Sequence, residues 1–184
     1  ILWFSLFRTW MGLVGLCKMP WADIAPADNA TKPHPFRIQE HVDNYVKIFT
    51  AVTGKEIDEK GILQQSERMH TLQRLLNIRM GLWGVAEDTP PYRAMGPVTE
   101  EEYLYREKHY DTEIEKYTGI DQKKKKLKDR IDALRKAKYQ LFEDLQQKVY
   151  AARGWDERGV PKVETLKRLN IDFPEAIELV NSVK

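Results

Sequence analysis

The stretch from Asp121 to Arg153 constrains the fold more than any other part of the sequence. It contains neither proline nor glycine, and apolar residues recur in it at alternating spacings of three and four, with Lys138 as the polar exception. These apolar residues are Leu127, Ile131, Leu134, Leu141 and Leu145. Such a seam predicts one long helix that packs against a single neighbouring helix. Because residues 118–120 offer only a short turn, we expect an antiparallel helical hairpin with the preceding helix.

Most of the remaining chain also shows helical spacing. One helix is expected from Phe36 to just before Gly54, and a second from Asp58 to Arg79, where Gly81 stops it. The second helix is expected to bury the apolar residues of one face: Ile62, Met69, Leu72, Leu75, Leu76 and Ile78.

The last helices have clear start signals. Thr99 and Glu102 form a capping box that opens a helix ending around Gly119. A short helix follows Pro161, and Pro174 opens the final one. No pair of strands is indicated anywhere, so the predicted fold class is mainly α.

The chain is expected to have three parts. Residues 1–21 are apolar, carry Gly12 and Gly15 close to Cys17, and are predicted to form buried core beside a site. Residues 22–35 are rich in proline and are predicted to form a connecting arm. Residues 36–184 are expected to form a helical domain. Because this apolar segment opens the chain at an isoleucine rather than a methionine, we expect further polypeptide before it.

Composition excludes several classes of protein. Thirty basic residues against 28 acidic ones leave a formal net charge of +2, which is not typical of a nucleic-acid-binding protein. Arg8 interrupts the first apolar stretch, so neither a membrane span nor a secretory signal is predicted there. Cys17 is the single cysteine, so the chain cannot form an internal disulfide, and a reducing, cytoplasmic location is expected.

Residues 12–17 read Gly-Leu-Val-Gly-Leu-Cys. This segment resembles the Asp-x-x-Gly-Leu-Cys motif of the aldehyde ferredoxin oxidoreductase family, whose members bind a tungsten bis-pterin and a 4Fe-4S cluster. The resemblance implies that Cys17 is a cluster ligand and that Gly15 and Leu16 line the pterin. Gly12 stands where the family usually has an aspartate that hydrogen-bonds the pterin, so that contact is not carried over.

Two later stretches resemble the same family. The first resembles the Glu-Arg...Leu-x-Arg-Leu-Phe-Asn-Leu-Arg-x-Gly helix and its loop, and its matching residues are Glu67, Arg68, Leu72, Arg74, Leu75, Asn77, Arg79, Gly81, Asp88, Pro91 and Arg93. The second resembles the terminal Tyr-x-x-Arg-Gly-Trp-Asp-x-x-Gly-x-Pro signature, and its matching residues are Tyr150, Arg153, Gly154, Trp155, Asp156, Gly159 and Pro161, followed by Leu166 and Leu169. The resemblance therefore spans Gly12 to Leu169.

The resemblance implies that this chain is part of a larger enzyme. The proline-rich arm and the helical hairpin look like insertions, as in enlarged members such as the tungsten subunit of class II benzoyl-coenzyme A reductases. The implied activity is low-potential two-electron chemistry on an aldehyde or carboxylate, or on an aryl-CoA thioester. The implied partners are the remainder of the catalytic subunit, an iron-sulfur subunit or ferredoxin, and a small-molecule substrate. No catalytic acid or base is assigned.

The residues also allow a less specific interpretation. A lone cysteine in an apolar segment is usually an inert buried thiol. The chain would then be a helical interaction module without a redox centre, with Lys123 to Lys126 facing solvent or docking an acidic partner. No metal-ligand spacing links the four histidines, which are His34, His41, His70 and His109. The enzyme interpretation predicts iron and tungsten in the parent complex, whereas the interaction-module interpretation predicts neither metal.

Overall fold

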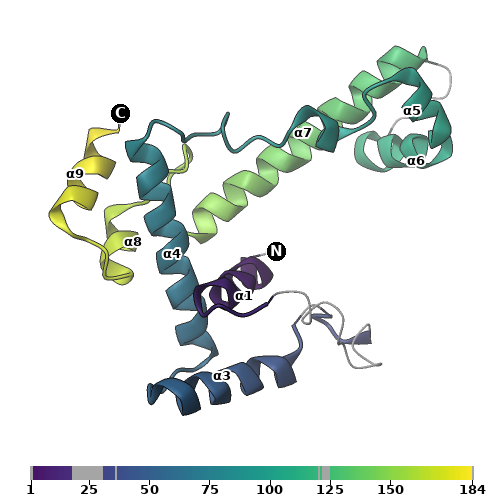
Figure 1. Ribbon diagram of the computed structural model, residues 1–184. Helices are drawn as coiled ribbons and strands as arrows, with labels where there is room; N and C mark the ends of the chain where they lie inside the picture. The colour runs from purple at the N-terminus through teal and green to yellow at the C-terminus, as the bar shows by residue number, and fades with distance from the viewer. Residues whose placement is uncertain (1, 18–30, 36, 120, 122–124, 184) are drawn as a thin grey trace. The chain divides into compact units, whose positions relative to one another are not determined.

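A computed structural model describes residues 2–17, 31–35, 37–119, 121 and 125–183 (Figure 1). The described elements are α1 (Leu2–Leu13), α3 (Gln39–Thr53), α4 (Glu59–Arg79), a 3-10 helix η2 (Tyr92–Met95), α5 (Glu100–Tyr105), α6 (Glu107–Thr118), α7 (Leu127–Ala152), α8 (Val163–Arg168) and α9 (Pro174–Ser182). Over these ranges the backbone forms no strand beyond isolated bridge residues at Trp155 and Pro161. The prediction of a mainly α fold is confirmed.

The chain divides into two compact units, each described by itself below. Unit 1 consists of Ile1–Gly81 and Pro161–Lys184, and unit 2 consists of Leu82–Val160. Most of the expected proline-rich arm lies outside the described residues. The predicted boundaries after residues 21 and 35 therefore stay a prediction.

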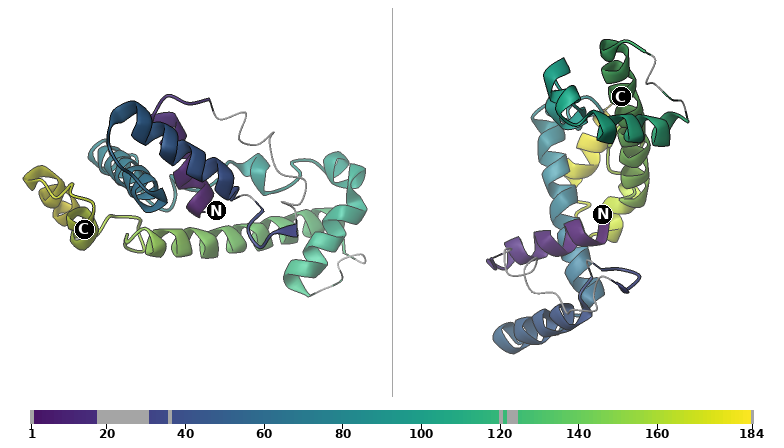
Figure 2. Two further views of the ribbon diagram at one scale, coloured as in Figure 1. Left: turned by 90° about the horizontal axis from the view of Figure 1, so that it is seen from below. Right: turned by 90° about the vertical axis from the view of Figure 1, so that its right-hand side faces the viewer.

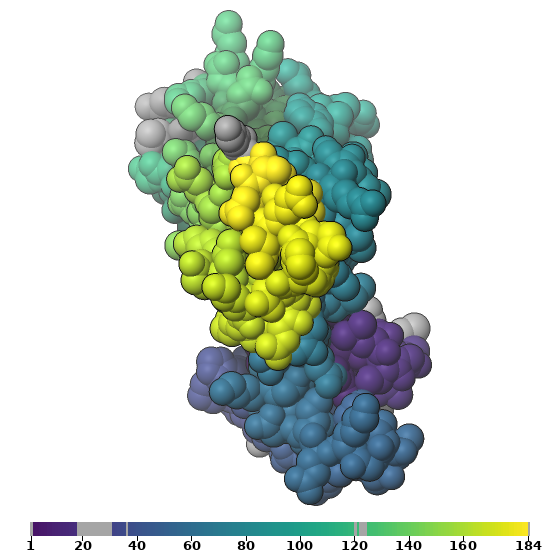
Figure 3. Space-filling model, turned by 90° about the vertical axis from the view of Figure 1, so that its left-hand side faces the viewer, coloured from purple at the N-terminus to yellow at the C-terminus, as the bar shows by residue number. Residues whose placement is uncertain are grey.

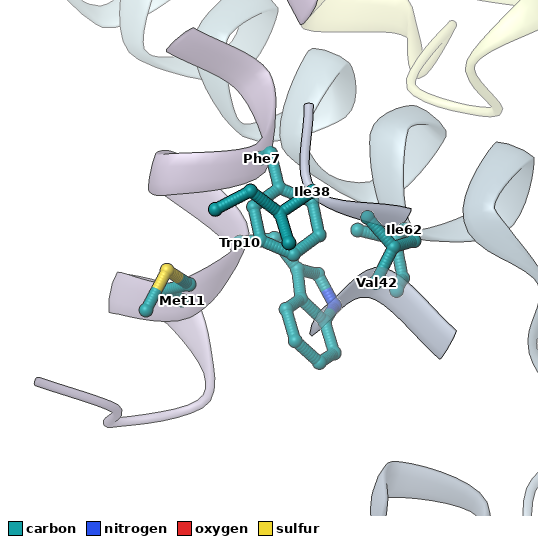
Figure 4. Close-up of a cluster of buried hydrophobic side chains, with 6 residues drawn as sticks. All are labelled: Phe7, Trp10, Met11, Ile38, Val42 and Ile62. Atoms are coloured by element: carbon teal, nitrogen blue, oxygen red, sulfur yellow. The ribbon is translucent and has the colours of Figure 1, made fainter. Parts of the chain in front are cut away.

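A cluster of apolar side chains holds α1 against α3 and α4 in unit 1. Figure 4 shows its six buried members, which come from α1, from the segment before α3, from α3 and from α4: Phe7, Trp10, Met11, Ile38, Val42 and Ile62. Two polar contacts add to this packing. The Trp10 indole donates a hydrogen bond to Gln65 at 3.1 Å, and the Thr9 hydroxyl lies 3.0 Å from Nε2 of His70. The whole of α1 is thereby fixed on α4.

The C-terminal helices attach to α4 through polar contacts as well as packing. Arg68 donates a hydrogen bond to the carbonyl of Leu169 at 2.7 Å, and Arg168 forms an ion pair with Glu67. Helix α9 packs against α4 and α8. In Figure 3 this C-terminal segment, drawn in yellow, lies at the surface of unit 1. The matched family residues of α4 therefore hold the end of the chain in place.

The buried face of α4 differs from the prediction. Met69 and Leu76 are exposed, whereas Ser66, Thr71 and Arg74 are buried. The reason is that α4 is covered by neighbours on more than one side, chiefly α1 and α9, so its buried surface follows those neighbours rather than a single apolar stripe. Its ends agree with the sequence: Asp58 caps the N-terminus by accepting from the amide of Gly61 at 2.7 Å, and Gly81 follows the C-terminus with φ of 75°.

In unit 2, α6 packs against α7, and α5 contacts both (Figures 1 and 2). Their shared core consists of Tyr103, Ile114, Ile131 and Leu134. The single helix expected from Thr99 to Gly119 is instead two helices, because Arg106 leaves the helical conformation with φ of −127° and ψ of 30°. The start predicted at Asp121 is also wrong: α7 begins at Leu127, and Lys125 and Lys126 precede it.

The expected seam of α7 is only half buried. Ile131 and Leu134 belong to the core with α5 and α6, but Leu141 is 47% exposed and Leu145 is 39% exposed. The core that α7 shares with α5 and α6 includes only its first half. Residues 122–124 lie outside the described residues, so the predicted role of Lys123 and Lys124 is not addressed by the structure.

Candidate cofactor-binding turn

Helix α1 ends in a tight turn that directly precedes Cys17. The amide of Leu16 donates to the carbonyl of Met11 at 2.8 Å, and the amide of Gly15 donates to the carbonyl of Gly12 at 3.3 Å. These two bonds define a Schellman motif, in which the residue at the position of Gly15 must adopt a left-handed conformation. Gly15 has φ of 77°, which a residue with a side chain rarely adopts.

This turn is exposed, which corrects the expectation of buried core with low solvent access. One face of α1 is buried through Phe7, Trp10 and Met11. The end of the helix is not: Leu13 is 46% exposed, Leu16 is 38% exposed, and Cys17 is an exposed free thiol. A helix lying on α4 and α3 buries one side only, and the turn leaves that contact surface.

Space around the turn is open. A side chain placed on Gly15 would meet no atom within 4 Å. Gly12 is exposed and contributes only backbone, so no side chain of the type found in the family motif is present there. The backbone and the thiol can therefore be approached closely by another body, which fits a cofactor held from outside this segment.

Among the residues that the structure describes, Cys17 belongs to no cluster of possible metal ligands. Within the described ranges, no group of three or more His, Cys, Asp and Glu side chains could hold a metal ion. Two of the four histidines have contacts elsewhere: His70 contacts Thr9, and His109 lies 3.9 Å from Glu113. One exposed cysteine is compatible with a shared cluster whose remaining ligands would be supplied from elsewhere, since a cluster needs about four.

The terminal family signature forms a second Schellman turn, in unit 2. The amide of Trp155 donates to the carbonyl of Tyr150 at 2.9 Å, and the amide of Gly154 donates to Ala151 at 3.0 Å. The rings of Tyr150 and Trp155 lie 5.9 Å apart, which is the apolar contact that usually accompanies this motif. The signature thus closes the end of α7, and Trp155 has a structural role there.

Asp156 orders the chain after that turn. Its Oδ1 accepts from the amides of Arg158 at 3.0 Å and Val160 at 2.8 Å, and its Oδ2 forms an ion pair with the Arg158 guanidinium at 2.9 Å. Burial acts to raise the pKa of Asp156, but the hydrogen bonds from Val160 and Arg158 together outweigh it and lower the pKa below its usual value. This carboxylate acts as a structural anion.

A buried arginine braces the loop between α4 and α5. Arg135 on α7 donates to the carbonyls of Tyr92 at 2.7 Å and Gly96 at 3.0 Å, and also to Pro97. Its guanidinium carbon lies 3.5 Å from the centroid of the Tyr92 ring. This role could not be inferred from the sequence, because the acceptors are backbone carbonyls about forty positions away.

Unit 2 also contains a polar cluster that the sequence analysis missed. Arg130 on α7 forms ion pairs with Asp111 and, at 2.9 Å, with Glu107, and it lies over the Tyr103 ring. The hydrogen bond to Asp111 is the largest influence raising the pKa of Arg130, so its positive charge is secure. Ion pairs between helices so far apart in sequence follow no periodic rule.

The glycine-cysteine turn and most of the helices lie within the range that a known protein family matches. Residues 1–171 match the family described as aldehyde ferredoxin oxidoreductase, domains 2 & 3. The chain belongs to the aldehyde ferredoxin oxidoreductase family. Comparison with curated proteins and with solved structures gave no match. Among the helices that the structure describes, none is both long and apolar enough to span a membrane.

Proposed function

We propose that Cys17 is one thiolate ligand of a 4Fe-4S cluster, and that Gly15 and Leu16 line a tungsten bis-pterin in a low-potential oxidoreductase. The observation that carries this proposal is the exposed thiol directly after a Schellman turn. The family match over residues 1–171 supports it. The bound groups would supply two-electron chemistry at the metal and single-electron transfer through the cluster.

In this proposal, the residues of this chain hold the cofactor-binding turn in place. Trp10 and Phe7 anchor α1, so the turn at its end has a fixed location relative to α4. Gly15 keeps backbone accessible, and Leu16 offers an apolar surface against which a planar ring can lie. Cys17 is exposed after this turn, so a partner carrying the other three thiolates would complete the cluster. That partner would be the remainder of the catalytic subunit.

The proposal also includes the class of substrate. We infer either oxidation of an aldehyde, or the reverse reduction of a carboxylate, or reductive dearomatisation of an aryl-CoA thioester. Electrons would pass to or from a ferredoxin or an iron-sulfur subunit in the cytoplasm. Support for the aryl-CoA option comes from the stretch between Arg93 and Tyr150, which looks like an insertion of the kind found in enlarged family members.

A cysteine variant of the complete enzyme tests the metal assignment. Cys17→Ala should lower iron and acid-labile sulfide and abolish the cluster's electron paramagnetic resonance signal, whereas Leu13→Ala, on the same exposed helix end, should leave both unchanged. In the wild-type enzyme, Cys17 should also resist alkylation until iron is chelated. Full iron content in the Cys17→Ala enzyme, or a Cys17 that alkylates freely, would overturn the assignment and favour a helical interaction module.

Substrate assays with the complete enzyme separate the two reactions. An enzyme that acts on aldehydes should oxidise them with reduction of a low-potential dye. An enzyme that acts on aryl-CoA thioesters should decrease the aromatic absorbance of benzoyl-CoA in the presence of a strong reductant. Activity on neither substrate, in an enzyme that retains iron and tungsten, would reject the substrate classes and keep the cofactor assignment.

A further inference from the structure

Helix α1, which leads into the cofactor-binding turn, carries a single charged residue, Arg8. The sequence of residues 2–17 contains no aspartate or glutamate, so no carboxylate of this segment neutralises it. The buried residues of α1 are Phe7, Trp10 and Met11. Arg8 is only partly buried, and it shares a face of the helix with the exposed Gly12, four residues later. A positive charge therefore lies on the accessible side of this helix.

The Arg8 guanidinium has no anionic partner among the residues that the structure describes. Its side chain forms neither a hydrogen bond nor an ion pair with any of them. Its guanidinium carbon lies 5.4 Å from the centroid of the Phe4 ring, one turn earlier on α1. A guanidinium in this state keeps all its N–H donors for an oxyanion, which it can hold through two parallel hydrogen bonds.

Gly12 leaves the surface beside Arg8 uncovered. Side chains of a helix lean toward its N-terminus, so a side chain at position 12 would lie over the turn that contains Arg8. An aspartate there, as in the family motif, would be within reach of an ion pair with Arg8, because the two positions are four residues apart. Arginine at position 8 and glycine at position 12 therefore replace a hydrogen-bond acceptor on this face by a donor.

Arg8 is also close to the turn at Gly15 and Cys17. Four residues of helix separate Arg8 from Gly12 by about 6 Å along the axis, and the turn follows directly. The buried Phe7, the residue before Arg8, fixes this part of α1 in the core of unit 1. A cofactor that lies along the turn and carries an oxyanion can therefore contact both the turn and the guanidinium.

We propose that Arg8 binds the phosphate group of a pterin cofactor held at the turn of Gly15 and Cys17. This inference rests on the proposed function, and it adds a residue that recognises the cofactor by charge. The phosphate of such a cofactor lies at the end away from its dithiolene sulfurs. A phosphate is the acceptor that a free guanidinium prefers, whereas the amino group of the pterin ring would need an acceptor that Gly12 lacks.

The rate of pterin release from the complete enzyme tests the role of Arg8. Pterin that leaves the enzyme during dialysis is oxidised and measured by its fluorescence. Arg8→Met should release it about tenfold faster or more, because charge-assisted hydrogen bonds are lost, and Arg8→Lys should lie between the two. Lys47→Met, which removes an exposed cation of α3, should behave like the wild type. Circular dichroism and iron content show whether each variant is folded.

Substitutions at Gly12 separate charge from size. Gly12→Asp should also speed release, because its carboxylate would pair with Arg8 and repel the phosphate. Gly12→Asn, which has nearly the same size without the charge, should change the rate less. Unchanged release in Arg8→Met, or a pterin held as tightly in Gly12→Asp as in the wild type or more tightly, would overturn the role of Arg8.

Inorganic phosphate shows whether the phosphate is the group that Arg8 binds. At equal ionic strength, phosphate in the dialysis buffer should speed release from the wild type more than chloride does, and it should have no such effect on Arg8→Met. An equal effect of phosphate on both proteins would also overturn the role of Arg8. These outcomes leave the proposed function intact, whereas a wild-type enzyme that contains no pterin or no iron would reject the proposed function itself.

Discussion

Arg130 on α7 and Asp111 on α6 form an ion pair in which one guanidinium nitrogen reaches both carboxylate oxygens. Both side chains are largely buried, and the Arg130 guanidinium carbon lies 5.0 Å from the centroid of the Tyr103 ring on α5. Three helices of unit 2 thus meet at one charge. The pair fixes which faces of α5 and α6 turn toward α7.

Removing the anion of this pair should destabilise unit 2 strongly. In Asp111→Asn the buried guanidinium loses its main partner, and we expect a loss of about 3 kcal/mol in the free energy of unfolding. The exposed Glu107 contributes less, so Glu107→Gln should cost less than about 1 kcal/mol. Urea denaturation of both variants measures the difference. If Asp111→Asn and Glu107→Gln lowered the free energy of unfolding equally, the burial of Arg130 would not determine the stability of its ion pair with Asp111.

Alkaline pH should weaken the same cluster. Burial, followed by the hydrogen bond that Tyr103 donates to Asp111 at 2.7 Å, raises the pKa of Tyr103 to about 12 from 10.0. Because the folded state then holds its proton more tightly than the unfolded state, this stability is fully present below pH 10. It is lost as the pH rises through about 12.

Tyr103→Phe isolates that effect, since it removes the titrating hydroxyl and keeps the ring. Between pH 10 and 12 the stability of the wild type should fall more steeply than that of Tyr103→Phe. Denaturation at several pH values, with the difference between the two proteins taken at each, measures it. Parallel pH profiles would contradict a raised pKa at this residue.

Local signals in the sequence predicted the helix ends well. Gly54 ends α3, Asp58 caps α4 and Pro174 opens α9, as expected, because each of these residues acts through its own backbone geometry or side chain. Thr99 likewise caps α5, although the Glu102 carboxylate also reaches the amide of Val98 at 2.8 Å. Interactions within one turn can be inferred from sequence.

Contacts between distant residues could not be inferred in this way. The break at Arg106 and the exposure of Leu141 both depend on how α5, α6 and α7 pack, and no periodic pattern specifies that. At the candidate site, the roles that the family resemblance implies for Gly15, Leu16 and Cys17 stay a prediction, whereas the expected burial of this turn was wrong. Apolar composition predicted burial, whereas among the described residues only one face of α1 is buried.

Loss of the Asp156 carboxylate should loosen the turn after α7. In Asp156→Ala, the amides of Arg158 and Val160 lose their acceptor, with an expected cost of about 1 to 3 kcal/mol. Because hydrogen bonding outweighs burial and lowers the pKa of Asp156, its contribution is present above the ordinary carboxyl pKa. It is lost as the pH falls through the lowered folded value.

The neighbouring carboxylate provides a matched control. Glu157 is exposed, so Glu157→Ala should leave the free energy of unfolding within about 0.5 kcal/mol of the wild type. The wild type should also lose more stability than Asp156→Ala on acidification below pH 4. Thermal denaturation across acidic pH measures both, and identical acid sensitivity in the two proteins would reject a lowered pKa.

The two glycines at the end of α1 should respond in opposite directions to alanine. Gly15 has φ of 77°, so Gly15→Ala should lower stability by about 1 kcal/mol even though its new methyl group meets no atom within 4 Å. Gly12 lies within the helix, so Gly12→Ala should raise stability by up to about 1 kcal/mol. In the complete enzyme only Gly15→Ala should lower iron content, because it alone distorts the turn that positions Cys17. Denaturation measures the two shifts in stability, and metal analysis measures the iron content. If both variants kept full iron, the geometry of the turn would not determine cluster binding.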